Sequence, residues 1–498
     1  MPRRREFPPI CVALGCAETA ELERLAREAC ASGERFLEVR MDLLREPQQA
    51  LGVIRGLKDR YPDVLVLATC RRQEGGGEFR GSVEEQMRLL EAAVEAGAEA
   101  VDVEVESAAA ERSSGLRGRA KRILSYHNFE RTPALGPVLR RLEKTPADVY
   151  KIVTMARRPT DNWRVLDLAA RRRAQPLVAL AMGEAGLGSR VLSLSRGAAF
   201  TYASPGGSPT APGQVPAALL RRQYRAERLT ADTPIYGVIA SPIAHSISPA
   251  VHNRAFQARR IDAVYLPFLV EPGQLVDFLT LAKRLPIAGF SVTIPHKQKI
   301  LRRLAAVDPL ARRVGAVNTV YRKGGTLRGT NTDAPGVTAP LEKRLRLRGS
   351  QVVVVGSGGA ARAAAFALAD RGARVFLAGR HAGRVQALAR ACGAVALDGL
   401  AGRRFDALVH ATPVGMHPLS DATLFPGEIP AEVVFDMVYN PLETRLLREA
   451  RAAGKKVISG LEMFLEQAAA QFEIWTGAPA PRAAMERAAR QALAEAPP

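Results

Sequence analysis

The sequence predicts an α/β fold, with a (β/α)8 barrel in the first half of the chain and a second α/β unit after it. Three observations predict this arrangement. Eight short apolar or β-branched runs alternate with segments of helical periodicity up to residue 204. A Gly- and Pro-rich segment then interrupts the pattern, and further on an apolar strand leads through a glycine-rich turn into a helix.

The predicted strands of the first half are residues 10–15, 36–44, 64–71, 100–106, 122–129, 149–156, 176–183 and 198–204. Helical periodicity between them is clearest over residues 18–30, 83–96 and 161–173. Alternation at this spacing is typical of parallel strands joined by crossover helices, and eight such units close a TIM barrel. A doubly wound open sheet would alternate too, but eight units without a glycine-rich first turn make it the second choice.

The division of the chain follows from residues 204–216, SPGGSPTAPGQVP, which can form neither a helix nor a central strand. We predict a short helical run over 217–228 and a new strand from Ile235, so the boundary lies near 229–234. The predicted domains are a barrel over 8–228, a second domain over 235–338 completed by 460–490, and a third over 339–459.

The composition is that of a globular protein, with 47% hydrophobic and 24% charged residues among 498, which excludes extended disorder, collagen-like repeats and coiled coil. No apolar stretch approaches the length of a membrane span, and the basic N-terminus lacks the apolar segment of a signal peptide. The five cysteines are odd in number and form no CxxC pair, which indicates a reducing compartment without structural zinc. We therefore expect a cytoplasmic protein.

The net charge of +21 raises nucleic acid as a possible partner. The excess of Lys and Arg is spread over both halves, only 5% of residues are aromatic, and no basic stretch interleaves aromatic residues as a base-stacking surface would. We expect small anionic substrates as partners, and neither nucleic acid nor a membrane. The sequence leaves the oligomeric state open.

Polar residues follow the ends of the predicted barrel strands, where a barrel carries its functional side chains. These residues are Glu38, Arg40, Arg71, Glu74, His127 and Arg190. Lys151 stands among Val149, Tyr150, Ile152 and Val153, so it is expected to be desolvated. Burial and neighbouring guanidinium groups favour the neutral amine, which can attack a carbonyl group, and His127 is then a candidate proton shuttle.

With these motifs, the first half resembles type I 3-dehydroquinate dehydratase over about residues 8–228. The resemblance implies a Schiff base on Lys151, catalytic His127 in a Ser-x-His-Asn-Phe motif, and Glu74 of Glu-Gly-Gly as the partner of that histidine. The spacing from Arg71 to Glu74 is one residue shorter than the family pattern. The resemblance further implies metal-free loss of water from 3-dehydroquinate, with the substrate bound by Glu38, Arg40, Arg71, Arg190, Thr210 and Gln214.

The second half contains an apolar strand, residues 352–355, that runs into Gly356-Ser-Gly-Gly-Ala-Ala and then a helix over 363–371. This is the context of a Rossmann dinucleotide-binding turn, in which glycines let the backbone approach a pyrophosphate at a helix N-terminus. The next strand ends in Arg380 where NAD-binding folds place an acid, which favours NADP(H). The predicted cofactor residues here are Gly356, Gly358, Gly359, Ala360, Ala361, Arg380 and Arg384.

Short polar strings precede this domain, and each by itself is typical of turns. Together they resemble shikimate dehydrogenase over about residues 235–478. The resemblance implies Lys297 and Asp333 as the catalytic pair. It also implies carboxylate binding by Ser246 and Ser248, hydroxyl binding by Thr293, Asn318, Tyr439 and Gln467, and cofactor contacts from Met416 and Gly460. Ser291 replaces an Asn of many bacterial members, and His245 and His296 are expected to be structural.

The product of the first implied reaction, 3-dehydroshikimate, is the substrate of the second, so we expect one bifunctional chain of the shikimate pathway that reduces 3-dehydroshikimate to shikimate with NADPH. Two alternatives remain. One is a quinate/shikimate dehydrogenase that prefers NAD(H), against which Arg380 argues. The other is a catalytically retired scaffold or regulator, against which the joint retention of four catalytic residues argues: Lys151, His127, Lys297 and Asp333.

Overall fold

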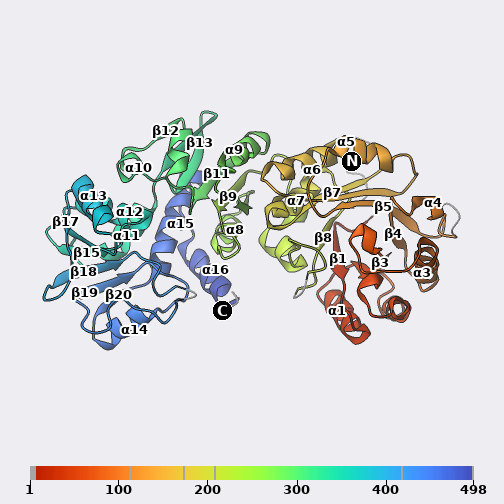
Figure 1. Ribbon diagram of the computed structural model, residues 1–498, viewed down its shortest axis with the longest axis horizontal. Coiled ribbons are helices and arrows are strands. Elements are labelled where there is room, and N and C mark those ends of the chain that lie inside the picture. The colour runs from red at the N-terminus through yellow and green to blue at the C-terminus, as the bar shows by residue number, and fades with distance from the viewer. Residues whose placement is uncertain (1–6, 112–114, 172–173, 207–208, 417–418, 496–498) are drawn as a thin grey trace. The chain divides into compact units, whose positions relative to one another are not determined.

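The computed structural model describes residues 7–111, 115–171, 174–206, 209–416 and 419–495 (Figure 1). Contacts divide the chain into two compact units, Met1–Thr233 with Pro267–Pro286, and Pro234–Leu266 with Ile287–Pro498. The domain boundaries expected near residues 338 and 459 stay predictions.

The first unit contains an eight-stranded parallel sheet in the order β7-β6-β5-β4-β3-β2-β1-β8. Its strands are β1 (Ile10–Leu14), β2 (Phe36–Arg40), β3 (Leu65–Thr69), β4 (Ala100–Glu104), β5 (Lys121–Asn128), β6 (Val149–Met155), β7 (Leu177–Met182) and β8 (Thr201–Ala203). The backbone N–H of Ala199, just before β8, donates to the carbonyl oxygen of Leu177 at 2.9 Å. This bond joins the two end strands, so the predicted (β/α)8 barrel is confirmed and the open sheet is not.

The helices of this unit follow the strands as predicted: α1 (Thr19–Ala31), α2 (Ala50–Arg60), α3 (Val83–Glu95), α4 (Ala108–Glu111), α5 (Leu135–Leu142), α6 (Thr160–Ala170) and α7 (Leu187–Leu192). Residues 172–173 of the helix predicted over 161–173 lie outside the described residues. The helical run expected over 217–228 is confirmed only over its first part, because residues 217–218 are α-helical and Leu219–Gln223 π-helical. The run then ends, since Arg225 adopts a left-handed backbone with φ of 52°, and Ala226–Arg228 form a separate 3₁₀ turn.

Aromatic side chains fill the interior of the barrel away from the strand ends. The rings of Phe36 and Phe200 lie 5.0 Å apart edge to face, and Phe7 packs 5.5 Å from each of them. All three residues are buried. Because this plug is apolar, the polar side chains of the barrel are confined to the carboxyl ends of the strands.

The second unit contains two sheets. The first is mixed, with the order β10-β9-β11-β13-β14-β12. Its strands are β9 (Ile235–Ala240), β10 (Val264–Leu269), β11 (Ile287–Val292), β12 (Ala306–Val307), β13 (Thr319–Lys323) and β14 (Thr326–Thr330). The helices in and after this segment are α8 (Ser248–Ala258), α9 (Leu275–Arg284), α10 (Pro309–Val314) and α11 (Asp333–Glu342), with α15 (Gly460–Thr476) and α16 (Arg482–Glu495) returning from the end of the chain. Most of α9 belongs to the range grouped with the first unit.

The other sheet is parallel, in the order β17-β16-β15-β18-β19-β20. Its elements are β15 (Gln351–Val355), α12 (Gly359–Asp370), β16 (Arg374–Ala378), α13 (Ala382–Cys392), β17 (Val395–Ala396), β18 (Phe405–His410), β19 (Ala431–Asp436), α14 (Arg445–Ala452) and β20 (Lys456–Ile458). Strand order reverses between β15 and β18, and the crevice at such a reversal is where doubly wound sheets bind ligands.

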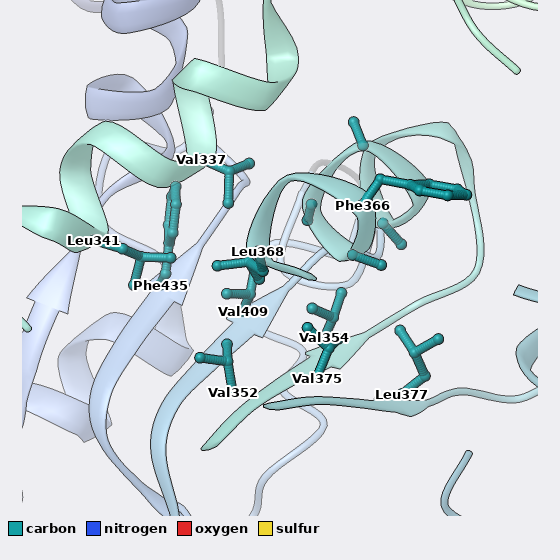
Figure 2. Packing of buried hydrophobic residues seen from close by; sticks show 14 of the residues in the cluster. Val337, Leu341, Val352, Val354, Phe366, Leu368, Val375, Leu377, Val409 and Phe435 are labelled. Carbon is teal, nitrogen blue, oxygen red and sulfur yellow. The ribbon is translucent and has the colours of Figure 1, made fainter. Parts of the chain in front are cut away.

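Figure 2 shows the apolar core that holds α12 on this sheet. Leu368 of α12 is fully buried and packs with Val352 and Val354 of β15, while Val337 of α11 and Phe435 of β19 belong to the same cluster. This packing fixes the start of α12 directly after the glycine-rich turn. Within the described part of the chain, no helix is both long and apolar enough to cross a membrane.

Candidate functional sites

A cavity at the carboxyl ends of the barrel strands collects most of the polar residues predicted for the first half. Its lining consists of Glu38, Arg40, Arg71, Gly76, His127, Phe129, Lys151, Val153, Leu180, Met182, Arg190, Tyr202, Thr210, Ala211 and Gln214. Eight of the nine predicted residues are among them, and Glu74 is not. The strand register explains this gathering, because parallel neighbours place their last residues at one rim of the barrel.

Lys151 of β6 is buried, and its ammonium group contacts three polar groups. Its Nζ atom donates to Asp102 Oδ2 and to the hydroxyl of Tyr202, each at 2.8 Å, and lies 3.6 Å from Glu38 Oε1. Sequence reasoning expected arginines around this lysine and missed Asp102 and Tyr202. A signal for Asp102 was present, since Asp102 and Glu104 alternate along a buried strand as Glu38 and Arg40 do.

Asp102 is the centre of a buried ionic cluster. Its other carboxylate oxygen accepts from Arg71 Nη2 at 2.9 Å and from Ser125 Oγ at 2.6 Å. Burial by itself would raise the pKa of Asp102, but the adjacent Lys151 and Arg71 cations hold that pKa well below its usual range. Asp102 is therefore a permanent anion that anchors both cations.

His127 of β5 lies two residues after Ser125, and Ser125 is the register partner of Lys151 on the neighbouring strand β6. Burial, followed by the positive charges of Arg71 and Lys151, lowers the pKa of His127 well below its usual value. The imidazole is therefore neutral near pH 7 and can accept a proton. Its Nδ1 atom is buried and has no hydrogen-bond partner among the described residues.

Arg190 of α7 is a buried guanidinium without a carboxylate in contact among the described residues. Its Nη2 donates to the carbonyl oxygen of Pro212 at 3.2 Å, and its Nε has no partner. Burial lowers the pKa of Arg190 to about 10. A buried cation of this kind is suited to an anionic ligand, which would supply the missing charge.

The position predicted for Glu74 is wrong. Its side chain is 72% exposed and pairs with Arg72 Nη2 at 2.9 Å. The next residue, Gly75, passes so close to Glu104 that a Cβ atom there would lie 2.6 Å from Glu104 Oε1. The buried acid beneath this loop is instead Glu104, which accepts from the backbone N–H of Arg72 at 2.9 Å.

The loop that carries Thr210 and Gln214 closes one side of the cavity. Gln214 Oε1 accepts from the backbone N–H of Thr210 at 2.9 Å and from its hydroxyl at 3.0 Å. Gly213 has φ of +73°, and a Cβ atom at this position would lie 2.3 Å from the carbonyl oxygen of Gly183. This tight approach holds both side chains at the cavity.

In the second unit, the predicted pair of Lys297 and Asp333 is in direct contact. Lys297 Nζ donates to Asp333 Oδ2 at 2.6 Å, and Asn318 Nδ2 donates to the other oxygen of that carboxylate at 2.7 Å. Asn318 Nδ2 also lies 3.2 Å from Gln467 Oε1 of α15. Four predicted residues therefore form one cluster: Lys297, Asp333, Asn318 and Gln467. The cluster combines an ammonium group that can donate a proton with side chains that can bind hydroxyl groups.

A second set of polar side chains extends from this cluster, and two of its members, Tyr265 and Gln471, were missed by sequence reasoning. The Tyr265 hydroxyl lies 2.7 Å from Ser291 Oγ, which donates to Gln471 Oε1 at 2.9 Å. Gln471 Nε2 donates to the carbonyl oxygen of Asn318 at 3.3 Å. The signal for Gln471 was its position one helical turn after Gln467 on α15. Ser291 is thus engaged within the protein.

The other predicted residues of this half occupy loop and helix-start positions. Ser248 begins α8, and its backbone N–H donates to Ser246 Oγ at 3.4 Å. Thr293 follows β11. Tyr439 follows β19, and its ring centre lies 5.4 Å from that of Phe464, with the two rings tilted by 40°. Of the two histidines expected to be structural, His296 is fully buried and His245 is exposed.

The glycine-rich turn after β15 has the geometry of a dinucleotide cradle. Gly356 has φ of +133°, and a Cβ atom there would lie 2.7 Å from the carbonyl oxygen of Ala411. Gly358 and Gly359 begin α12 with open space where a Cβ would stand, and Ala361 is buried beneath the turn. Ala360 lies between Gly359 and Ala361 in the first turn of α12. A pyrophosphate can therefore approach the backbone N–H groups at the start of this helix.

The remaining predicted cofactor residues lie in the segments that follow strands β16, β18 and β20 of this sheet. Arg380 follows β16 and Arg384 lies in the first turn of α13, both exposed. Met416 is 45% exposed in the segment after β18. Gly460 begins α15, where a Cβ atom would lie 2.4 Å from the carbonyl oxygen of Val438.

A buried histidine that the sequence did not single out lies at the strand reversal. His410 ends β18 beside Val355 and contacts Asp436 through Nδ1 at 2.9 Å and Thr412 Oγ1 through Nε2 at 2.5 Å. These contacts order the start of the segment that leads to Met416. Among the described residues, no group of three or more His, Cys, Asp or Glu side chains is placed to hold a metal ion.

Comparison with protein families gives three matches. Residues 10–230 match the type I 3-dehydroquinase family, residues 238–320 match the shikimate dehydrogenase substrate binding domain, and residues 460–490 match the shikimate 5'-dehydrogenase C-terminal domain. These matches cover the barrel, most of the mixed sheet, α15 and the first part of α16.

Individual relatives agree with these matches. The chain is 37% identical to the chloroplastic bifunctional 3-dehydroquinate dehydratase/shikimate dehydrogenase of Arabidopsis thaliana, over 90% of this chain and 79% of that protein. It is 44% identical to the NADP(+) shikimate dehydrogenase of Methanosarcina mazei, over 52% of this chain and 98% of that protein. The crystal structure of shikimate dehydrogenase from Aquifex aeolicus matches with a TM-score of 0.50 and 34% identity, over 53% of this chain and 99% of that one.

We predict that Asp102→Asn destabilises the barrel by about 3–5 kcal/mol, because it leaves Lys151 and Arg71 buried without their shared anion. Since the folded-state pKa of Asp102 is depressed, its contribution is present above about pH 4 and is lost as the pH falls, so the difference from wild type should narrow in acid. Native-state hydrogen exchange of peptides from β4 to β6 measures this.

The matched control is Asp167→Asn, which removes an exposed carboxylate 2.7 Å from Arg171 and should cost less than about 1 kcal/mol. Equal protection of the β4 to β6 peptides from hydrogen exchange in the two variants at pH 7 would contradict the anchoring role of Asp102.

Proposed function

The chain belongs to the family of bifunctional 3-dehydroquinate dehydratase/shikimate dehydrogenases, and on that premise we propose that Lys151 and Lys297 carry its two successive reactions. The barrel would convert 3-dehydroquinate into 3-dehydroshikimate through an imine on Lys151. The second unit would reduce 3-dehydroshikimate to shikimate with NADPH. The observation that supports both assignments is a lysine in each unit held by a carboxylate, at 2.8 Å in one and 2.6 Å in the other.

In the barrel, Lys151 Nζ attacks the ketone carbon of the substrate, and the carbonyl oxygen leaves as water while a C=N⁺ bond forms. The positive iminium draws electrons from the neighbouring C–H bond. The neutral imidazole of His127 accepts that proton. The resulting enamine expels the hydroxyl group on the next carbon, which takes the proton from His127 and leaves as a second water. Water finally hydrolyses the imine and frees Lys151.

The cations of this cavity suit a small carboxylate with several hydroxyls. Arg190, which lacks an acidic partner among the described residues, is the proposed site for the substrate carboxylate. Glu38, Arg40, Arg71, Thr210 and Gln214 line the same cavity and are the proposed partners of the hydroxyls. Glu104, and not Glu74, is the buried acid that holds the loop after β3, through the backbone N–H of Arg72.

In the second unit, the Lys297 ammonium is proposed to donate a proton to the carbonyl oxygen of 3-dehydroshikimate as that carbon is reduced. Asp333 orients this ammonium through a hydrogen bond, and Asn318 fixes the carboxylate through its second oxygen. Gln467 and Thr293 are proposed hydroxyl partners, with Tyr439 on the side of the parallel sheet. Ser246 and Ser248 are the proposed carboxylate site.

NADPH, when bound, supplies the hydride. The cradle of Gly356, Gly358 and Gly359 with the start of α12 would hold its pyrophosphate, and Arg380 with Arg384 its ribose 2′-phosphate. Met416 and Gly460 are proposed to border the nicotinamide. Three statements stay predictions from the sequence. They are that the chain needs no metal, that it has no nucleic-acid partner, and that it is located in the cytoplasm.

A coupled assay tests the two assignments together. Wild-type chain given 3-dehydroquinate and NADPH should oxidise NADPH, because both sites act in sequence. Lys151→Met should abolish this activity and leave the oxidation of NADPH by 3-dehydroshikimate intact. Lys297→Met should lower kcat with 3-dehydroshikimate by about 10²–10⁴-fold with little change in KM, since it removes a proton donor.

The two lysine variants are controls for each other, because each leaves the site in the other unit unaltered. NADPH oxidation from 3-dehydroquinate in the Lys151→Met chain would contradict the imine. A rise in KM without loss of kcat in Lys297→Met would reduce that lysine to a binding residue.

Arg380→Ala tests the cofactor assignment. If Arg380 binds the 2′-phosphate, its loss should lower the ratio of kcat/KM for NADPH over NADH by about 10-fold or more, because a charge-assisted hydrogen bond is worth about 1.5–3 kcal/mol. Steady-state kinetics with 3-dehydroshikimate and each cofactor give this ratio. Arg390→Ala, an equally exposed arginine at the far end of α13, should leave the ratio unchanged.

A further inference from the structure

Tyr202 of β8 is a buried residue of the barrel cavity that the mechanism has not yet used. It is 3% exposed and its hydroxyl oxygen accepts from Lys151 Nζ at 2.8 Å. The same Nζ atom lies 4.1 Å from the centre of the Tyr202 ring. The ring and the hydroxyl therefore both touch the atom that is proposed to attack the substrate.

The position of Tyr202 is fixed independently of Lys151. Its strand is paired to β1, where Cys11 is its register partner, and its ring packs 5.5 Å from Phe200 in the aromatic plug of the barrel. A phenyl ring would fill the same space. The hydroxyl is therefore not needed for packing, and it introduces a polar group beside an ammonium that already has a carboxylate partner.

Two hydrogen bonds determine the direction of the lone pair of Lys151. The nitrogen is tetrahedral, with one bond to Cε, one N–H directed to Asp102 and one to Tyr202. When the ammonium loses its third proton, the two remaining N–H bonds stay with these acceptors, and the lone pair takes the remaining direction. Glu38, at 3.6 Å from Nζ, is too distant to fix a third hydrogen bond.

We propose that Tyr202 is a positioning residue for imine formation, whose hydroxyl works with Asp102 to aim the Lys151 lone pair into the cavity. Burial, and after it the negative charge of Glu38, raises the pKa of Tyr202 well above its usual value, so the hydroxyl stays neutral. A neutral hydroxyl attracts the protons of Lys151 less than the Asp102 carboxylate does. This inference rests on the proposed function of Lys151.

The hydroxyl gains and loses no proton in this step. Starting from the ammonium, two of its three protons leave with the carbonyl oxygen as water, one stays on the iminium nitrogen, and the nitrogen lone pair forms the new bond to carbon. Tyr202 acts only before and during attack, when the nitrogen still has two N–H bonds to direct. Its removal should therefore slow imine formation and leave substrate affinity nearly unchanged.

Tyr202→Phe in the full chain tests the proposal, since it deletes the hydroxyl and keeps the ring. We expect kcat with 3-dehydroquinate to fall about 10-fold with KM within about twofold of wild type. In rapid-quench experiments with excess borohydride, the first-order rate at which Lys151 acquires the reduced adduct should fall by a similar factor. Mass spectrometry of the Lys151 peptide measures that rate.

Tyr150→Phe is the matched control, because Tyr150 is also buried and lies next to Lys151 in the chain, but its hydroxyl donates to the carbonyl oxygen of Thr145 at 3.2 Å. This variant should trap at the wild-type rate. A Tyr202→Phe chain that traps as fast as Tyr150→Phe overturns the proposal. A Tyr202→Phe chain that shows only a higher KM also overturns it, since the hydroxyl would then bind substrate.

The wild-type chain separates failure of this inference from failure of the proposed function. If wild type yields no adduct on Lys151, the imine itself is wrong; if wild type yields it and Tyr202→Phe does so equally fast, only the role of Tyr202 is wrong. Incorporation of 3-fluorotyrosine at position 202 retains the hydroxyl and nearly the same volume, and makes the oxygen a weaker acceptor. It should trap at a rate between those of wild type and Tyr202→Phe, and a rate below that of Tyr202→Phe would contradict the proposal.

Discussion

A lysine at least partly removed from water and held by a carboxylate is the interaction on which each unit of this chain depends. An ammonium removed from water is costly unless an anion and further hydrogen bonds replace its hydration. In the barrel, Asp102 supplies the anion and is itself held by Arg71 and Ser125. In the second unit, Asp333 supplies it and is fixed by Asn318. The surrounding strands and loops are arranged so that these partners meet.

The two lysines differ in enclosure, and that difference matches their proposed chemistry. The Lys151 side chain is 4% exposed, inside a barrel whose far end is plugged by aromatic rings, whereas the Lys297 side chain is 23% exposed. A nucleophile that forms a covalent bond benefits from a fixed direction of attack and from exclusion of water. A proton donor must instead exchange its proton between turnovers, which partial exposure permits.

Both sites use the same property of parallel strands, which is that their carboxyl ends meet at one edge. In the barrel this brings residues of β2, β5, β6, β7 and β8, and Arg71 just after β3, to one cavity. In the parallel sheet it places the glycine-rich turn after β15 beside the end of β18, where the strand order reverses. The buried contact of His410, the last residue of β18, with Asp436 of β19 holds the end of β18 in place.

The sequence by itself determined the fold and most of the catalytic groups. Eight alternating units predicted the barrel, and the strand, glycine-rich turn and helix around Gly356 predicted the nucleotide-binding sheet, because both depend on local periodicity and on backbone conformations that only certain residues adopt. Lys151 stood out because a charged residue within an apolar strand is unusual in a sequence, whereas the roles of Lys297 and Arg190 came from the family resemblances.

Only the tertiary structure decided which groups touch. Asp102 and Tyr202, 49 and 51 residues from Lys151 in sequence, meet its ammonium because of strand register and side-chain direction around the closed barrel. Glu74 was misplaced for a related reason, since contacts between distant segments leave its carboxylate exposed beside Arg72 and put Glu104 beneath the loop. Distances across a closed sheet depend on every intervening connection, and local sequence does not encode them.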